Sequence, residues 1–410
     1  MLWQAKLINT ELHPVSGVYI GTTAAKIKKS GSDDFVVFQF CEQAITVASF
    51  TQNAFCAAPV TLAKTHLAEL SYKADMNIRA LVINSGNANA GTGQQGLSDA
   101  KQTCSWLAEE IGCQPNQVLP FSTGVIGENL PMEKIEIAMP MAVANLSVSH
   151  WKEAANGIMT TDLVEKIYSK VVDVAGHSVT ITGISKGSGM IHPNMATMLG
   201  FVATDAKITQ DCLQVILSNA ITKSFNRITV DGDTSTNDAC TLTATQLADM
   251  PIIDSVDSVA FQQFSTAIDE CMIDLAQKII RDGEGATKFV SIKVEKAKTV
   301  EEALLVANTI ALSPLVKTAL FASDPNWGRI LAAVGRAGVE DLAVDKLQIY
   351  LGNVLLVENG GRASSYSEQA GQAVMNETDI TIRVILNRGK IAETVWTTDF
   401  SYDYVKINAE

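Results

Sequence analysis

The sequence predicts a mixed α/β (α+β) fold with more than one sheet, because strand-like and helix-like segments are intermixed along the whole chain. Its 410 residues suffice for two domains or for one large body, and no Pro/Gly/Ser-rich linker divides them. With 47% hydrophobic and 18% charged residues, the chain has the composition of a globular protein with an ample core. A layered globular body is therefore expected.

Strands are predicted by short apolar runs and by alternation of apolar and polar residues. Four such runs precede the middle of the chain: 18–27, 35–39, 78–83 and 179–182. A Gly/Asn-rich stretch at 84–93 predicts a loop after the third run. Near the C-terminus, the runs 380–386 and 391–396 flank Asn387-Arg-Gly-Lys390, which predicts a β-hairpin.

Helices are predicted where apolar residues recur every three or four positions. Three stretches have this spacing: 98–112, 211–225 and 258–280. The first has Ser98 as a predicted N-cap and Gly112 as a C-terminal stop. Each helix would lay its apolar face on a sheet.

Composition limits the partners and the compartment of the protein. Its net charge of −13 argues against nucleic acid or an anionic membrane as the main partner. The first residues lack the pattern of a secretory signal, and the apolar stretches are too short to span a bilayer. The seven cysteines form an odd set without a CxxC pair, which is typical of reduced thiols. We therefore expect a soluble cytoplasmic protein.

The known catalytic motifs are mostly missing from this sequence. None of its five histidines lies in HExxH or at zinc-finger spacing from cysteines, and there is no P-loop, so we expect no metal and no cofactor. The stretch 183–187 does fit the GxSxG nucleophile elbow. Since only His192 follows Ser185, too close in the chain for the triad, the α/β-hydrolase interpretation fails.

A threonine that becomes a new N-terminus offers acyl-transfer chemistry without histidine. Its α-amine, with an unperturbed pKa of about 7.7–8.0, can act as the base for its own hydroxyl. Ala196-Thr197 follows a Gly/Pro-rich stretch and has the small residue and the hydroxyl that this route needs. Taken alone, the pattern fits the start of a strand better than a nucleophile.

A resemblance to a known family favours the nucleophile over the strand start at this position. The run Lys186-Gly-Ser-Gly-Met-Ile-His-Pro-Asn-Met-Ala-Thr-Met-Leu199 closely resembles the signature of the ornithine acetyltransferase (glutamate N-acetyltransferase) family of arginine biosynthesis. Other stretches resemble the family in the same order along the chain: 27–31, 84–90, 122–127, 159–162, 231–238, 282–288, 324–329 and 404–410. Several such motifs in order make the resemblance specific.

The resemblance implies a self-cleaving enzyme with a layered α/β sandwich, a fold related to that of N-terminal-nucleophile aminopeptidases. Cleavage between Ala196 and Thr197 would leave an α-chain, 1–196, with the oxyanion hole and part of the substrate pocket. The β-chain, 197–410, would supply the nucleophile and the rest of the pocket. The family further implies a heterotetramer of two α- and two β-chains.

The implied reaction moves an acetyl group from N2-acetylornithine to glutamate in two ping-pong steps on Thr197. Thr123 and Gly124 match the family's oxyanion hole. The positions that match its substrate-binding residues are Thr160, Lys186, Thr197, Glu284 and Asn408. A lysine suits the substrate carboxylate and a glutamate suits the side-chain amine of ornithine. Chemistry alone does not separate Thr160 from Thr161, and position in the motif favours Thr160.

Some features depart from the family or leave alternatives open. Family chains usually continue a few residues beyond Glu410 with a further Ser or Thr for the pocket, so either the sequence is shortened or that contact is missing. The small polar residues of the motifs 231–238 and 324–329 fit an ordering role at the pocket or at the subunit contact as well as they fit a buried hydrogen-bonded turn network, so we do not place these motifs in the active site. No motif decides whether acetyl-CoA is also a donor, which would add amino-acid N-acetyltransferase activity. The alternatives are an N-terminal-nucleophile aminopeptidase or amidase, and an unprocessed, inactive binding homologue.

Overall fold

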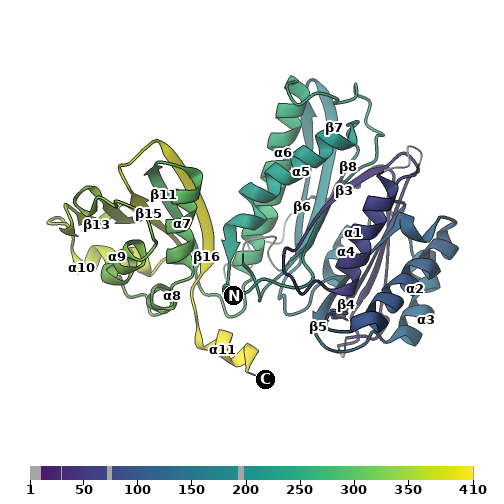
Figure 1. The fold of residues 1–410 in the computed structure, drawn as a ribbon, viewed down its shortest axis with the longest axis horizontal. Helices are drawn as coiled ribbons and strands as arrows, with labels where there is room; N and C mark the ends of the chain where they lie inside the picture. Colours follow the sequence, from purple (N-terminus) through teal and green to yellow (C-terminus); the bar gives the residue numbers. More distant parts are fainter. Residues whose placement is uncertain (1–10, 29, 72–75, 193–197, 410) are drawn as a thin grey trace.

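The protein, seen here as a computed structural model, is described for residues 11–28, 30–71, 76–192 and 198–409. Two sheets lie face to face in one body, and a third sheet forms the base of a second body (Figure 1). The predicted mixed α/β class with more than one sheet is confirmed. Ala196 and Thr197 lie outside the described residues.

The first sheet contains the N-terminal strands in the order β1-β2-β4-β5, with only β4 and β5 parallel. An apolar cluster that includes Val37, Val82 and Leu107 joins one face of it to α2 and α3. Its elements are β1 (Val18–Thr23), β2 (Phe35–Phe40), α1 (Ala58–Leu70), β4 (Ala80–Asn87), α2 (Gly93–Ile111), a 3₁₀ turn (Pro115–Gln117), β5 (Val118–Val125), α3 (Met132–Ala144) and α4 (Trp151–Gly157).

The second sheet has the order β3-β10-β8-β7-β6 and packs on α5 and α6. Between the two sheets, the ring of Phe201 lies 5.8 Å from that of Phe38 and 5.1 Å from that of Phe121. The layers therefore run helix, sheet, sheet, helix. The elements are β3 (Ile45–Phe50), β6 (Lys166–Val174), β7 (His177–Lys186), β8 (Leu199–Thr204), α5 (Gln210–Lys223), a 3₁₀ turn (Phe225–Arg227), β10 (Ala239–Ala244) and α6 (Val259–Arg281).

The third sheet has the order β14-β13-β12-β15-β11-β16-β9. Its last strand, β9 (Ile228–Thr229), comes from the chain between the second sheet's strands and so ties the two bodies together. The other elements are β11 (Phe289–Ala297), α7 (Val300–Ala311), α8 (Pro314–Phe321), α9 (Trp327–Gly335), a 3₁₀ turn (Val344–Lys346), β12 (Gln348–Leu351), β13 (Val354–Glu358), β14 (Gly361–Arg362), α10 (Glu368–Met375), β15 (Asp379–Ile385), β16 (Ile391–Thr398) and α11 (Tyr402–Asn408).

The loop predicted at 84–93 is wrong in its first part, because β4 continues to Asn87. Asn84 is buried there and its amide is satisfied, since Nδ2 donates to Asn87 O at 2.8 Å and Oδ1 accepts from Ser122 Oγ at 2.6 Å. The following helix also begins earlier than predicted, at Gly93 rather than near Ser98, and ends as predicted at Gly112. The helices predicted at 211–225 and 258–280 are confirmed.

The predicted C-terminal hairpin is also wrong. Both strands exist, but β11 lies between them, parallel to β15 and antiparallel to β16. The connection wraps the end of β11, where Arg388 N and Gly389 N both donate to Lys296 O at 2.8 Å. The apolar strand β11 gains two partners in this way, which a local turn signal does not indicate.

The apolar helices of the second body pack on its sheet. Among the described residues, no single helix is long and apolar enough to cross a membrane, and one bent pair, α7 and α8, meets the length and composition test at an angle of 57°. Apolar residues of this pair, such as Val306 and Ile310, belong to the buried cluster that packs on the third sheet.

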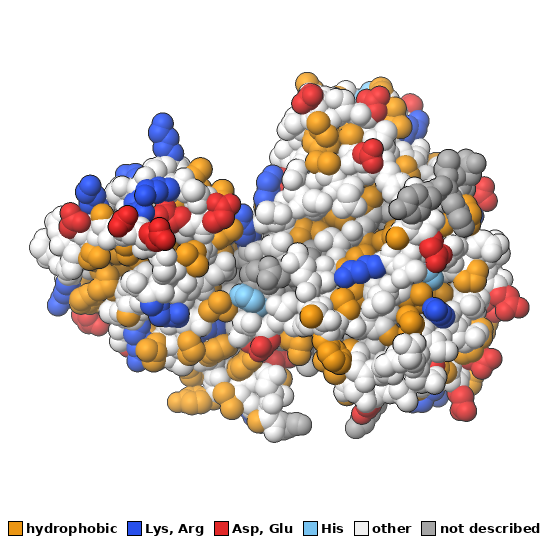
Figure 2. Space-filling view, in the orientation of Figure 1, with side chains coloured by type: hydrophobic (Ala, Val, Ile, Leu, Met, Phe, Trp, Pro, Cys, Tyr) orange, Lys and Arg blue, Asp and Glu red, His pale blue; other side chains and the backbone are white. Residues whose placement is uncertain are grey.

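Figure 2 shows acidic and basic side chains interspersed over the visible face.

A buried lysine in this body predicts a pH-dependent stability. Lys317 on α8 is 1% exposed and donates to Thr397 Oγ1 at 2.7 Å and to Thr398 O. Burial lowers its pKa to about 7, although Asp399 opposes this. Because the unfolded chain then binds more protons than the folded one between pH 7 and the ordinary value of 10.5, stability should rise with pH across that window.

Replacing Lys317 by methionine should flatten this rise. The measurement is the free energy of unfolding by urea at several pH values from about 7 to about 9, for the wild type and for Lys317→Met. Parallel curves for the two proteins would show that Lys317 keeps its ordinary pKa.

Candidate active site

A pocket of about 400 Å³ opens where β4, β5 and β7 end. Residues from both sheets and from α11 form its wall. The described lining residues are Lys28, Gly86, Ala88, Thr123, Gly124, Val125, Ile126, Thr160, Thr161, Lys186, Gly189, Met190, Ser235, Asn237, Glu284 and Asn408. Every predicted pocket residue except Thr197, which is not described, is thus present in one cavity. Thr160 and Thr161 both line it, so the choice between them stays a prediction.

Two glycines allow the strands β4 and β5 to approach closely at the pocket. Gly124 has φ +134°, and a Cβ there would lie 2.3 Å from the carbonyl carbon of Gly86 and 2.5 Å from Asn87 N. The register of the two strands shifts at the same place, between Gly86 and Asn87. This bulge directs the end of β5, with Thr123 and Gly124, into the cavity.

Gly124→Ala is therefore expected to destabilise the protein more than a comparable change nearby. Gly127 also has a positive φ, +89°, but a Cβ there would meet no atom within 4 Å. Gly127→Ala should cost about 1–2 kcal/mol of unfolding free energy through its backbone conformation alone. Gly124→Ala adds a clash with backbone and should cost clearly more, measured by urea unfolding. Equal losses for both variants would contradict the close approach.

Lys186, a cation of the pocket, contacts the predicted oxyanion residue Thr123 directly. Lys186, at the end of β7, is 5% exposed, and its Nζ donates to Thr123 Oγ1 at 3.0 Å. Burial lowers the pKa of Lys186, while the charges of Asp162 and Glu284 act in the opposite direction. The site therefore holds a desolvated ammonium group that an incoming carboxylate would stabilise.

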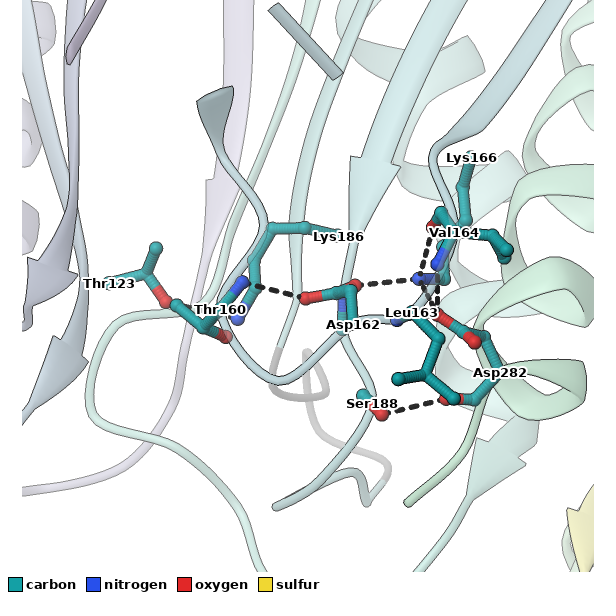
Figure 3. Close-up of polar contacts among 10 residues, drawn as sticks. Thr123, Thr160, Asp162, Leu163, Val164, Lys166, Lys186, Ser188 and Asp282 are labelled. Atoms are coloured by element: carbon teal, nitrogen blue, oxygen red, sulfur yellow. Dashed lines mark hydrogen bonds and ion pairs between the residues drawn. The ribbon is translucent and has the colours of Figure 1, made fainter. Parts of the chain in front are cut away.

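Behind Lys186 lies a buried ion-pair network that orders the pocket loops (Figure 3). Lys166 is fully buried, and its Nζ lies 2.6 Å from Asp162 Oδ1 and 2.7 Å from Asp282 Oδ2. Asp162 also accepts hydrogen bonds from Gly187 N at 2.8 Å and from Thr160 N at 3.0 Å. Although burial opposes ionisation, the charges of Lys166 and Lys186 hold the pKa of Asp162 below its usual range.

Glu284 is the anion among the described residues that line the pocket. The carboxylate of Glu284 lies directly over Gly189, where a Cβ would meet Oε2 at 2.3 Å. Glu284 is 8% exposed, and its Oε2 accepts a hydrogen bond from Asn408 Nδ2 at 2.8 Å. Asn408 is delivered by α11, at the far end of the chain. The pocket thus contains side chains of opposite charge.

The motif 231–238 was not assigned to the active site from the sequence, but two of its residues contribute to the pocket. Ser235 and Asn237 line the pocket, and Asn237 Nδ2 donates to Ala88 O at 2.6 Å and to Ser122 O at 2.9 Å. The loop that bears them runs from β9 to β10 and returns to the ends of β4 and β5. Only the three-dimensional pairing of these strands indicates this, because the motif by itself fits an ordinary turn network.

A second lysine of the pocket, Lys28, was also missed. It belongs to the family-like stretch 27–31, which was the available signal. The motif 324–329 caps α9 through Asn326 and is not among the pocket-lining residues described above. Among the described residues, no group of three or more His, Cys, Asp or Glu side chains could hold a metal ion.

The amino-acid sequence is similar to those of known proteins over nearly its whole length. Residues 19–410 match the model of the ArgJ family. The chain is 53% identical over 399 residues to the arginine biosynthesis bifunctional protein ArgJ of Pseudomonas fluorescens and 52% identical over 404 residues to that of Methylococcus capsulatus, covering 97% of each. Those matches span 97% and 98% of this chain. A crystal structure of the ArgJ protein from Bacillus halodurans is 40% identical, with a TM-score of 0.49 over 51% of this chain and 97% of that one.

Proposed function

The chain belongs to the ArgJ family, and on this premise we propose that it transfers the acetyl group of N2-acetylornithine to glutamate. The observation that carries the proposal is that Lys186 and Glu284 line one pocket together with Thr123 and Gly124. An amino acid with a carboxylate and a side-chain ammonium group needs this pair of charges. The reacting acyl group needs hydrogen-bond donors for its oxyanion, which Thr123 and Gly124 would supply.

These charges explain how the acetyl donor, N2-acetylornithine, is recognised in the proposed reaction. Lys186 binds the α-carboxylate of N2-acetylornithine, and Glu284 binds its side-chain ammonium. Asn408 holds the Glu284 carboxylate through its 2.8 Å hydrogen bond. Thr160 contributes polar contacts from the loop that Asp162 fixes. The acetamide at Cα then lies near Thr123 and Gly124.

The proposed nucleophile is Thr197, freed by self-cleavage after Ala196. Its hydroxyl attacks the acetyl carbonyl, its α-amine takes the hydroxyl proton, and ornithine leaves with that proton on its amine. The glutamate amine then attacks the acetyl ester, and N-acetylglutamate leaves as the threonine hydroxyl is restored. Thr123 and Gly124 stabilise the oxyanion of both steps, and each such donor is typically worth about 2.7–4 kcal/mol.

The two chains, 1–196 and 197–410, would remain associated after cleavage. In support, β8 begins at Leu199 and is paired with β7 on one side and β10 on the other. The Met198 N–H also donates to the buried Asp238 Oδ1 at 3.0 Å. Breaking the peptide bond before Thr197 leaves all of these contacts in place. We further propose that two such α/β pairs assemble into a heterotetramer.

The test is an assay with N2-acetylornithine labelled in its acetyl group and saturating glutamate. We expect labelled N-acetylglutamate and free ornithine in equal amounts. Label released mainly as acetate would favour an aminopeptidase or amidase, and an intact, unreactive chain would favour a binding homologue. Labelled acetyl-CoA in place of acetylornithine tests for a second donor.

A further inference from the structure

A second cation, Lys28, lines the same pocket as Lys186. It follows β1 in the chain and borders the cavity together with Gly86 and Thr160. The acyl-transfer steps described above give it no role. Among the described lining residues, Lys28 and Lys186 are the cations and Glu284 is the anion. The described lining thus contains one more cation than anion.

The loop that carries Lys28 is built around the carboxylate of Asp34. Asp34 is fully buried, and it accepts hydrogen bonds from Ala25 N at 2.7 Å, Ile27 N at 2.6 Å and Lys28 N at 2.8 Å. The stem of Lys28 crosses Gly86, where a Cβ would lie 3.0 Å from Lys28 Cγ. The backbone and the stem are thus held by specific contacts at the pocket wall.

The ammonium group of Lys28 is only partly satisfied within the described part of the chain. There its Nζ donates one hydrogen bond, to Met159 O at 3.2 Å, whereas an ammonium group has three donors. Asp34 receives backbone N–H groups and so does not need Lys28 as its partner. Burial lowers the pKa of Lys28, although Asp34 and Asp162 oppose this. A further anion beside this ammonium would be stabilising.

The two substrates of the proposed reaction present opposite charges at the end of their side chains. N2-acetylornithine carries an α-carboxylate and a side-chain ammonium group, whereas glutamate carries two carboxylates. Glu284 attracts the ornithine side chain and repels that of glutamate. The acceptor therefore needs two cations from a pocket in which the donor uses one.

Resting on the proposed function, we propose that Lys28 binds the side-chain carboxylate of the acceptor glutamate. Lys186 holds the α-carboxylate that both substrates share. Glu284 then serves the donor and Lys28 serves the acceptor, so one acyl-enzyme selects two side chains of opposite charge. The pocket volume of about 400 Å³ has room for either side chain.

The test compares glutamate and glutamine as acceptors for the variant Lys28→Met, which removes the side-chain charge and keeps most of the aliphatic stem. With glutamate as acceptor, kcat/KM is expected to fall about 10- to 100-fold, the usual range for one charge-assisted hydrogen bond. With glutamine, which lacks the side-chain charge, kcat/KM is expected to stay unchanged. Release of ornithine from N2-acetylornithine in a single turnover without glutamate is expected to stay unchanged as well.

Two variants serve as matched controls. Lys26→Met removes an exposed lysine from the same loop and should behave as the wild type. Lys28→Arg keeps the charge and should keep the preference for glutamate over glutamine.

Equal losses with glutamate and glutamine, or a parallel loss in ornithine release, would assign Lys28 a structural role and overturn the inference. Unchanged glutamate kinetics in Lys28→Met would overturn it too. If the wild type makes no labelled N-acetylglutamate, the proposed function itself falls, and the inference falls with it.

Discussion

Replacing Thr197 by alanine is expected to leave the chain uncut and to abolish acetyl transfer. The variant lacks the hydroxyl that attacks the preceding carbonyl in the proposed mechanism, so no new N-terminus should form and the proposed nucleophile is missing. The loss of kcat should be on the order of 10⁶-fold, as for removal of a catalytic nucleophile elsewhere. Intact mass under denaturing conditions should show one 43.9 kDa species.

The wild type provides the contrast for this variant. Division of 43.9 kDa in proportion to 196 and 214 residues predicts two species of roughly 21 and 23 kDa. Sequencing of the larger should begin at Thr-Met-Leu-Gly. Thr197→Ser keeps a hydroxyl and should still be cut. A Thr197→Ala chain that is cut at this bond would refute the autoprocessing route.

Lys166→Met is expected to cause the largest loss of stability. It leaves Asp162 and Asp282 as neighbouring buried carboxylates without their shared cation. Removing one partner of a buried ion pair typically costs about 3–5 kcal/mol, because the remaining charge is desolvated and unpaired. Urea unfolding in the uncut Thr197→Ala background measures this on a single chain.

A surface lysine of the same strand is the matched control. Lys170 pairs with Glu270 at 3.3 Å, and both side chains are more than half exposed, at 54% and 56%. Lys170→Met should therefore cost no more than about 1 kcal/mol. A triple variant that neutralises Lys166, Asp162 and Asp282 together should recover part of the loss. Similar costs for Lys166→Met and Lys170→Met would show that the network is unimportant for stability.

The helices of this fold are easier to predict from the sequence than the strand pairing. For α5 and α6, the apolar spacing that predicts the helix is local, and in α6 the N-cap is local as well, since the Ser258 side chain accepts from Phe261 N. Strand partners depend on distant segments. Nothing between β15 and β16 indicates that β11, about ninety residues earlier in the chain, lies between them.

The residues of the site also divide into those that the sequence indicated and those that it did not. The family resemblance pointed to Thr123, Lys186 and Glu284, and these residues do line one pocket. Asn237 and Lys28 were missed because their roles depend on how the ends of β4 and β5 meet other loops. The sequence around a single polar residue in a turn does not indicate which distant strand ends that turn will contact.

The most direct test of the account is the mass of each chain after incubation with N2-acetylornithine in the absence of glutamate. The chain beginning at Thr197 is expected to gain one acetyl group, located on its first residue, and added glutamate should remove that group as N-acetylglutamate. An enzyme that transfers acetyl groups with no acetylated chain, or with the acetyl group on another residue, would contradict this expectation.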